Sequence, residues 1–313
     1  MLKYLGKRSL GLLTVLVGVM LFVSSLTYVI PGDPATIIIG QNATPEVRQK
    51  VIHDLGLDLP PLVRFAKYWR NILHGDFGFY VLSGRPALPE VLSAIPYTFV
   101  LATVSMLFSL FVGGALGVVS VWFKDTWIDH TISVASAGAV SVVQYVAALV
   151  LVLIFSVQLG WLPSIGVGEK GNLVDQIRYL ILPVLALSIS WIGYVQRIVR
   201  EALAETLYSD YVKTAKSFGI PRSSILMKHC LRNSAKPLVT VVVTGWGALL
   251  GGAVFVEAIF ARKGLGNLIV TALQQRDYYV AQAGIMAAVV LFMVAVILAE
   301  VVNAFVDPRI RLG

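Results

Sequence analysis

Long apolar stretches alternate with short polar ones along most of the chain. Six of the apolar stretches are long enough to be considered as membrane-spanning helices, because a bilayer core needs about 20 apolar residues per helix. The fourth is the weakest candidate, since it is short and contains Pro183. The predicted spans are residues 9–30, 95–123, 131–158, 179–196, 237–260 and 281–305. The pattern predicts an all-α polytopic membrane protein with six transmembrane helices.

The first span has the basic start of a secretory signal peptide, with Lys3, Lys7 and Arg8 ahead of the apolar run. The run is longer than the apolar core of a usual signal peptide, and no A-x-A cleavage site closes it. We therefore interpret residues 1–30 as an N-terminal segment followed by a retained helix.

The longest polar connection, residues 31–94, carries two amphipathic patterns. The first begins at Thr44 and Pro45, which suit a helix start, and ends at Gly56. The second follows Pro60 and ends at Gly75, and its apolar face is formed by Leu62, Phe65, Trp69 and Ile72. Two short helices in this loop indicate either a small extracytoplasmic cap or a spacer that lies on the membrane surface.

A basic and polar segment, residues 197–236, separates the fourth and fifth spans. Its first part contains no helix breaker, so we expect the fourth span to continue as helix to about Phe218. Gly219 suits a left-handed helix end and Pro221 prevents continuation, and Ser223 or Ser224 can begin a second short helix. An apolar side on which a partner could dock is expected from Leu203, Leu207, Phe218, Ile225 and Leu226.

Three interpretations of this segment remain open on physical grounds alone. A helix-turn-helix DNA reader is the least favoured, because the element is short and is tied to the bilayer at both ends. An ordinary basic loop that sets membrane orientation is the second. The third is a docking helix for a partner, for which a turn fixed by glycine and proline is well suited.

Composition and charge support the membrane assignment. Hydrophobic residues make up 57% of the 313 residues and charged residues only 13%, whereas soluble domains carry roughly a quarter charged residues. With a cytoplasmic N-terminus, 14 of the 25 lysine and arginine residues fall on the cytoplasmic side. This bias predicts that both termini are cytoplasmic. The net charge of +8 is then explained by topology and anionic lipid, with no need for a nucleic acid.

Motifs for chemistry are absent from the sequence. There is no G-x-x-x-x-G-K-[ST] motif to hold ATP, no H-E-x-x-H and no G-x-S-x-G, and the four histidines are scattered. The single Cys230 cannot form an internal disulfide. We therefore expect a non-catalytic chain with no cofactor and no metal site. A secondary transporter is the rival class, but charged residues at mid-bilayer and inverted repeats with broken helices are not evident.

A few polar residues inside the spans are candidates for a pore or gate. They are Gln144, Tyr145, Glu257, Glu300 and Asn303. Carboxylates in a membrane are costly unless they are paired or hydrated, so a helix-end position at the interface is the alternative for Glu257 and Glu300. Small-residue faces at 113–117 and 247–252 indicate close helix packing.

Several motifs together resemble one transporter family. The stretch "DYVKTAKSFGIPRSSILMKHCLRNSAKPLVT" resembles the cytoplasmic EAA loop of ABC transporter permeases, in the form found in the dipeptide, oligopeptide and nickel importer family. Lys213 and Thr214 depart from the general E-A-A pattern, as does "LRN" from its Leu-Pro. Further similar motifs follow in the family's order over nearly the whole chain: "YVIPGDP", "LGLDLP", "HGDFGF", "SGRPALPEVLSAIPYTF", "EAIFARKGLGNLIVTALQQRDYYVAQ" and "DPRIR". Within the fifth of these, "RKG" replaces a more usual Pro-Gly.

The resemblance implies a type I ABC importer permease fold, of the first of the two permeases in such systems. It implies a homologous second permease, two ATP-binding subunits that hydrolyse ATP, an extracytoplasmic solute-binding protein, and a bacterial or archaeal plasma membrane. In this interpretation residues 95–305 form the permease core and residues 306–313 a cytoplasmic tail.

The resemblance also assigns residues. The first-loop cap of such importers faces the binding protein, and if residues 31–94 form that cap, Phe65 and Trp69 of its second amphipathic pattern are the candidate contacts. Contact with the ATPase falls on Lys213, Thr214, Ala215, Lys216, Phe218, Gly219, Ile220, Pro221 and Arg222. Di- and oligopeptides are the expected substrates, with a nickel chelate, glutathione or a sugar as alternatives within the family.

Overall fold

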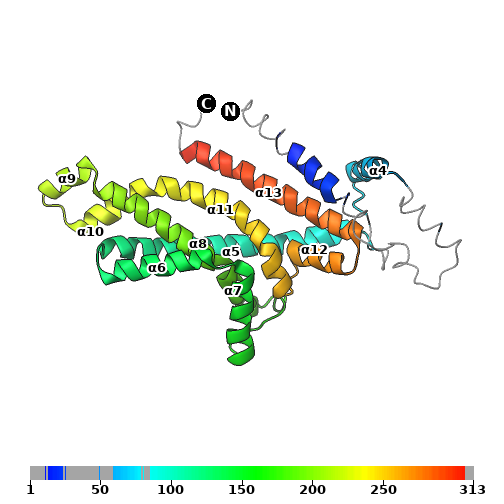
Figure 1. Cartoon of the computed structure of the whole chain (residues 1–313), viewed down its shortest axis with the longest axis horizontal. Coiled ribbons are helices and arrows are strands. Elements are labelled where there is room, and N and C mark those ends of the chain that lie inside the picture. The colour runs from blue at the N-terminus through cyan, green and yellow to red at the C-terminus, as the bar shows by residue number, and fades with distance from the viewer. Residues whose placement is uncertain are drawn as a thin grey trace. The chain divides into compact units, whose positions relative to one another are not determined.

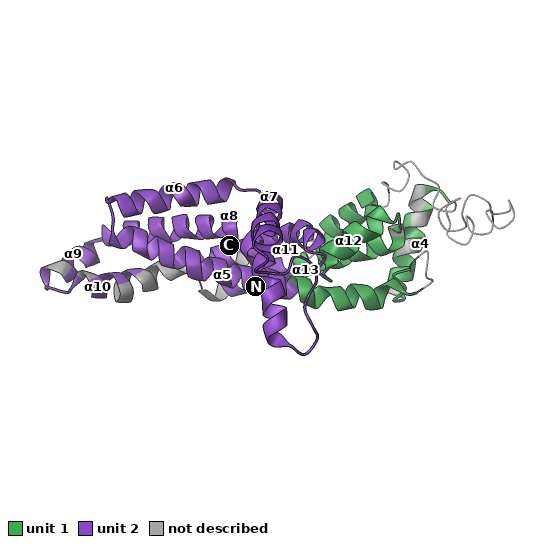
Figure 2. Cartoon of the chain, turned by 90° about the horizontal axis from the view of Figure 1, so that it is seen from below, with its two compact units in different colours: residues 1–98, 263–293 green, residues 99–262, 294–313 purple. Residues whose placement is uncertain are grey.

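The structure, a computed structural model, consists of helices and their connections (Figure 1). It describes residues 11, 13–23, 25, 49, 59–78, 80 and 85–306. The chain forms two compact units, Met1–Thr98 with Lys263–Met293 (unit 1) and Phe99–Arg262 with Val294–Gly313 (unit 2) (Figure 2). The long helices α5 and α13 each contribute residues to both units.

Four helices of the described residues are long and apolar enough to cross a membrane. They are α5 (Ala87–Trp122), α8 (Leu173–Leu207), α11 (Leu231–Ile259) and α13 (Tyr278–Val306). They correspond to the second, fourth, fifth and sixth predicted spans. The fourth begins before its predicted span, at Leu173, and continues beyond the end of that span to Leu207, with Pro183 buried inside it. Of the first predicted span, the structure describes a shorter apolar helix, Leu13–Val23, and much of the remainder lies outside the described residues.

The third predicted span is not one straight helix. It is divided into α6 (Trp127–Ser141) and α7 (Gln144–Leu151), which continues as the π-helix η1 (Val152–Gln158), and the two parts meet at 101°. Val142 and Val143 are extended at the break. The Ser190 hydroxyl on α8 donates to the Val142 carbonyl at 2.8 Å, which satisfies an acceptor that the break removes from the helix. Counted as one bent span, this pair gives a fifth candidate crossing.

Helix α8 packs closely against α5, α6 and α11 at positions where one of the two helices has a glycine. A Cβ atom on Gly113 of α5 would lie 2.6 Å from the Ile192 carbonyl oxygen, and one on Gly193 would collide with the Ser136 carbonyl of α6. Gly245 of α11 faces the Trp191 ring. The small-residue face at 113–117 therefore serves close helix packing, as the sequence predicted.

Unit 1 contains the second amphipathic helix of the long polar connection, α4 (Pro61–Leu73), where the sequence predicted it. Gly75 follows it with φ +82°, the left-handed conformation that glycine adopts readily. The first predicted helix, residues 44–56, lies outside the described residues apart from one position. A further helix that the sequence did not predict, α12 (Leu265–Gln274), begins where the Leu265 amide donates to the Thr98 hydroxyl at 2.8 Å.

The connection between α8 and α11 differs from its prediction as a continuous helix to about Phe218. Helix α8 ends at Leu207, and α9 (Asp210–Ser217) starts after a two-residue break. The Ser209 hydroxyl donates a hydrogen bond to the Thr206 carbonyl, and the Val212 amide donates one to the Ser209 carbonyl. Ser209 therefore ends one helix and begins the next. After a turn follow α10 (Arg222–Ser224) and the π-helix η2 (Ile225–Cys230), which runs directly into α11.

Candidate functional site

The turn between α9 and α10 has a defined backbone geometry. Gly219 has φ +74°, as the sequence predicted. The Phe218 amide donates to the Thr214 carbonyl at 3.1 Å, and the Ile220 amide donates to the Ala215 carbonyl at 3.2 Å. This second bond spans five residues and is the bond that closes a helix with a left-handed glycine. Gly219 and Pro221 therefore fix the angle at which the chain leaves α9.

One side of this turn is anchored in the apolar core of unit 2. Val212 of α9 is fully buried, and Ala215 and Ile220 pack partly buried against the same cluster. The cluster contains Leu203 of α8 together with Ile225 of η2, and Val121 of α5 also belongs to it. Displacement of α9 or η2 would therefore be transmitted to the adjoining ends of α8 and α5 through packed side chains.

The other side of the turn is open to its surroundings. Phe218 was expected on an apolar side for a partner to dock on, and its side chain is 81% exposed. Leu203, Ile225 and Leu226 were expected on the same side, but they are buried in the core of unit 2 and are closed to a partner. Lys213 is exposed and pairs with Asp210 of its own helix at 2.8 Å. Thr214, Gly219 and Pro221 are exposed as well. The structure describes the backbone of Lys216 and Arg222 but not their side chains.

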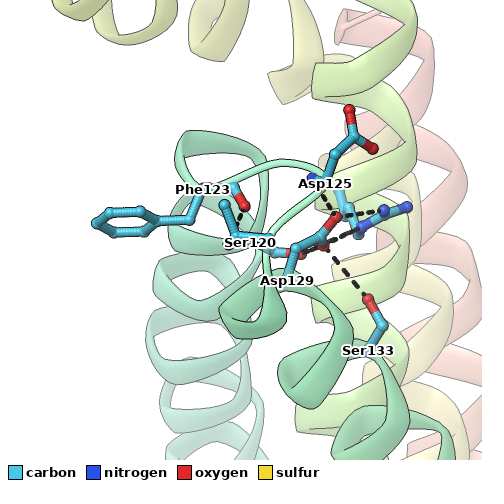
Figure 3. Close-up of polar contacts among 7 residues, drawn as sticks. Ser120, Phe123, Asp125, Asp129 and Ser133 are labelled. Carbon is cyan, nitrogen blue, oxygen red and sulfur yellow. Dashed lines mark hydrogen bonds and ion pairs between the residues drawn. The ribbon is translucent and has the colours of Figure 1, made fainter.

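A partly buried polar cluster, which the sequence analysis missed, joins three helices of unit 2 (Figure 3). Asp129 in the first turn of α6 accepts two hydrogen bonds from Arg200 of α8, Nε to Oδ1 at 2.8 Å and Nη2 to Oδ2 at 2.9 Å. The hydroxyl of Ser120, on α5, donates to the same carboxylate, and the Asp125 amide donates to it at 3.3 Å. We call Ser120, Asp125, Asp129 and Arg200 the three-helix cluster.

A second polar contact joins the α5–α6 turn to the end of α8. The Lys124 ammonium donates to the Tyr208 hydroxyl and lies 4.4 Å from the centre of the Tyr208 ring. The hydrogen bond to Tyr208 favours the charged form and raises the pKa of Lys124 above its ordinary value. Tyr208 follows the last residue of α8 and stands two residues ahead of α9.

Two of the predicted pore residues lie at the bend between α6 and α7. A pocket of about 810 Å³ opens there, and its lining includes Gln144, Tyr145, Ser190 and Phe255. The Gln144 amide nitrogen lies 3.5 Å from the Leu187 carbonyl oxygen of α8, and a Cβ atom on Gly252 would collide with the Gln144 amide oxygen. Gln144 and Tyr145 therefore border a space large enough for a small solute.

The other predicted site residues outside the turn differ in how far the structure describes them. Glu257 is fully buried within unit 2 and does not line the pocket at the α6–α7 bend. Glu300 and Asn303 lie on α13, and their side chains are outside what the structure describes. Phe65 and Trp69 pack partly buried in unit 1 against Leu16, Met20 and Ile72, with their rings edge to face at 6.1 Å. Their predicted role as a contact for a binding protein stays a prediction.

The part of the chain that the structure describes contains no group of three or more histidine, cysteine or acidic side chains that could hold a metal ion.

Comparison with known families identifies the class of protein. A family model described as "Binding-protein-dependent transport system inner membrane component" matches residues 87–312. The model for the N-terminal part of such membrane components matches residues 1–102. The chain belongs to this family. It is a permease subunit of an ABC importer, in a family of membrane subunits that are not themselves catalytic.

Curated relatives match the chain over almost its full length. The glutathione transport system permease protein GsiC of Pectobacterium atrosepticum is 35% identical over 311 residues, which covers 99% of both chains. The GsiC protein of Escherichia coli strain K12 is 34% identical with the same coverage.

Solved structures show the same fold at low sequence identity. The MetNI methionine ABC transporter in an inward-facing conformation matches with a TM-score of 0.57 and 16% identity, over 70% of this chain and 97% of that chain. An amino acid ABC transporter solved with histidines matches with a TM-score of 0.50 and 17% identity, over 69% and 94%. The chain therefore has the type I ABC importer permease fold that the sequence predicted.

Proposed function

We propose that this permease forms a translocation pathway together with a homologous second permease, and that ATPase subunits drive it through the turn between α9 and α10. The observation that supports this coupling role most strongly is the two-sided character of the turn. Val212 and Ile220 are anchored in unit 2, whereas Phe218 is exposed beside a left-handed Gly219. A partner that binds Phe218 would push on a rigid element whose other side is packed against α8 and α5.

The proposed contact consists of residues 213–216 and 218–222, the positions that match the EAA loop. ATP binding would close the ATPase dimer and carry the two coupling turns of the permease pair toward each other. Reorientation of the helices around the pathway would then expose it alternately to the two sides of the membrane. The pocket at Gln144 and Tyr145 is the part of unit 2 that we propose to border this pathway.

The proposed orientation places both termini in the cytoplasm, together with the α5–α6 turn and residues 197–236. The distribution of lysine and arginine supports it. Exposed Trp122, Phe123 and Trp127 flank the α5–α6 turn, and tryptophan is enriched where helices leave the membrane. The long connection at 31–94 then lies outside the cytoplasm, where we propose that it helps to receive a solute-binding protein.

In this proposal Phe65 and Trp69 support the receiving surface and do not themselves contact the binding protein. Since both rings pack inward against unit 1, they hold α4 in place, and the opposite face of α4 is available to a binding protein. That face carries exposed Val63, Lys67 and Arg70.

The proposed substrates are small peptides, and glutathione, itself a tripeptide, is the first candidate to test. The 34–35% identity with glutathione transport permeases over 99% of the chain supports this choice. The test is uptake of labelled glutathione, a dipeptide and a pentapeptide by cells that carry or lack this chain, with all other subunits present. Loss of glutathione or peptide uptake in the deletion, restored by the gene, is expected. Unchanged uptake of all three, with loss of a nickel chelate or a sugar, would assign a different substrate.

A further inference from the structure

The three-helix cluster is a partly buried ionic connection between α5, α6 and α8 of unit 2, to which Asp125 of the α5–α6 turn adds its amide (Figure 3). Asp129 is 6% exposed and Ser120 is fully buried. The Arg200 Nε also lies 3.1 Å from the Ser120 hydroxyl, so one guanidinium contacts two other helices at once. The Arg200 side chain is 33% exposed, so the pair is partly buried, and its two-bond geometry makes it more directional than a surface ion pair.

The position of the cluster relates it to the turn between α9 and α10. Arg200 lies on α8 one turn before Leu203, which is buried in the same apolar core as Val212 of α9 and Ile225 of η2. The contact of Lys124 with Tyr208 connects the α5–α6 turn to α8 a second time, directly ahead of α9. The ends of α5, α6 and α8 next to α9 are thus tied by polar contacts, while α9 and η2 are attached to α8 and α5 by apolar ones.

We propose that Asp129 and Arg200 are a positioning pair for transport. In this inference, which rests on the proposed coupling function, the pair makes the ends of α5, α6 and α8 move as one body with the turn around Gly219. Displacement of the turn by an ATPase then reaches α6, and with it the bend at Val142 that borders the pocket of Gln144. Without the pair, displacement of the turn would move α8 but would not be transmitted fully to α6.

Simple stabilisation of the fold is the competing role, and it predicts different behaviour. A pair that only stabilises would reduce the amount of assembled transporter and leave each assembled complex normally coupled. A positioning pair changes the solute imported per ATP hydrolysed in complexes that have assembled. This ratio separates the two roles.

The exposed pair of Arg197 with Glu201 supplies a matched control. It lies on the same helix with a separation of 3.2 Å, but both side chains are more than half exposed, so little energy is expected from it. Substitution of both residues by glutamine removes two charges from α8 but none of the hydrogen bonds of the three-helix cluster.

The experiment uses the complex purified through a tag on this chain and reconstituted in proteoliposomes, with uptake and ATP hydrolysis measured together. We expect Asp129→Asn to lower the ratio of uptake to hydrolysis about 10-fold, which is within the range of coupling between distant sites. Charge exchange by Asp129→Arg with Arg200→Asp is expected to recover a large part of the ratio. The control Arg197→Gln with Glu201→Gln should behave like the wild type.

A second measurement is the distance between spin labels at residues 127 and 217, at exposed positions on α6 and α9. In the wild type we expect it to stay constant between nucleotide states, and in Asp129→Asn to change with them. Uptake and hydrolysis that fall in proportion, with an unchanged label distance, would overturn the inference and leave the pair a stabilising role. A complex that contains no ATPase would contradict the proposed function, and with it this inference.

Discussion

A Cβ atom on Gly117 would lie 2.7 Å from the Cβ atom of Val199, so α5 and α8 approach each other here more closely than any side chain on α5 would allow. Gly113, one turn earlier on α5, is in the same situation against Ile192 and Val195. Gly114 lies between these two positions and has no atom within 4 Å of its Cβ position. A side chain at position 113 or 117 would therefore collide with α8, whereas one at position 114 would not.

The first prediction follows from this difference. Gly117→Val should destabilise the protein by about 1–3 kcal/mol, because the added side chain forces α5 away from α8. Gly114→Val, the matched control, should change stability by less than about 1 kcal/mol. The measurement is thermal unfolding of the purified chain in detergent. Equal melting temperatures for the two variants would contradict the packing described here.

The second prediction concerns α4. Joint replacement of Phe65 and Trp69 by serine should detach α4 from Leu16, Met20 and Met286, at a cost of several kcal/mol to unit 1, since partly buried aromatic side chains are lost. The expected results are faster proteolysis near Gly75 and reduced uptake by a transporter that still assembles.

The exposed face of α4 provides the comparison. Lys67→Glu with Arg70→Glu should leave proteolysis unchanged and weaken binding of the solute-binding protein, because the substituted side chains are exposed. If this variant binds and transports normally, the long connection is a spacer and not a receiving surface.

The third prediction concerns orientation. In a Cys230→Ser background, Ile165→Cys should react with a membrane-impermeant maleimide in intact cells, and Phe218→Cys only after the membrane is opened. Both positions are exposed in the chain, and reaction of residue 218 once the membrane is opened shows that its lack of reaction in intact cells reports the side of the membrane and not burial. Labelling of residue 218 from outside would reverse the proposed topology.

Local patterns predicted much of the fold but not the break in the third span. The apolar spacing of α4 and the lengths of α5, α11 and α13 are properties of neighbouring residues, so they could be recognised in the sequence. The break at Val142 contains neither glycine nor proline. It depends on Ser190 of α8, 48 residues away, which satisfies the freed carbonyl. Such a tertiary contact leaves no local pattern.

The same distinction holds for the candidate site. Gly219 and Pro221 identify their turn because each restricts the backbone at its own position. Asp129 and Arg200 are 71 residues apart, and each alone resembles a polar residue at a helix end. The burial of Leu203, Ile225 and Leu226 was also missed, because their apolar character alone did not distinguish a docking side from the core. Only the packing of α9 on α8 shows that Phe218 points away from it.

The central claim is that the turn at Gly219 transmits force from an ATPase, and Gly219→Val tests it most directly. A valine side chain would meet no atom within 4 Å of its Cβ, so its effect comes from the left-handed backbone, at a cost of roughly 1–2 kcal/mol that is relieved if the turn changes its angle. Gly219→Asn is the control, because asparagine tolerates this conformation.

The decisive measurement is uptake per ATP hydrolysed by the reconstituted complex, together with the amount of ATPase that co-purifies with the tagged chain. The account predicts that Gly219→Val inserts normally but loses uptake and either binds less ATPase or hydrolyses ATP without transport, while Gly219→Asn remains active. A Gly219→Val complex that transports and hydrolyses like the wild type would contradict the account and reduce residues 197–236 to a basic loop that only sets orientation.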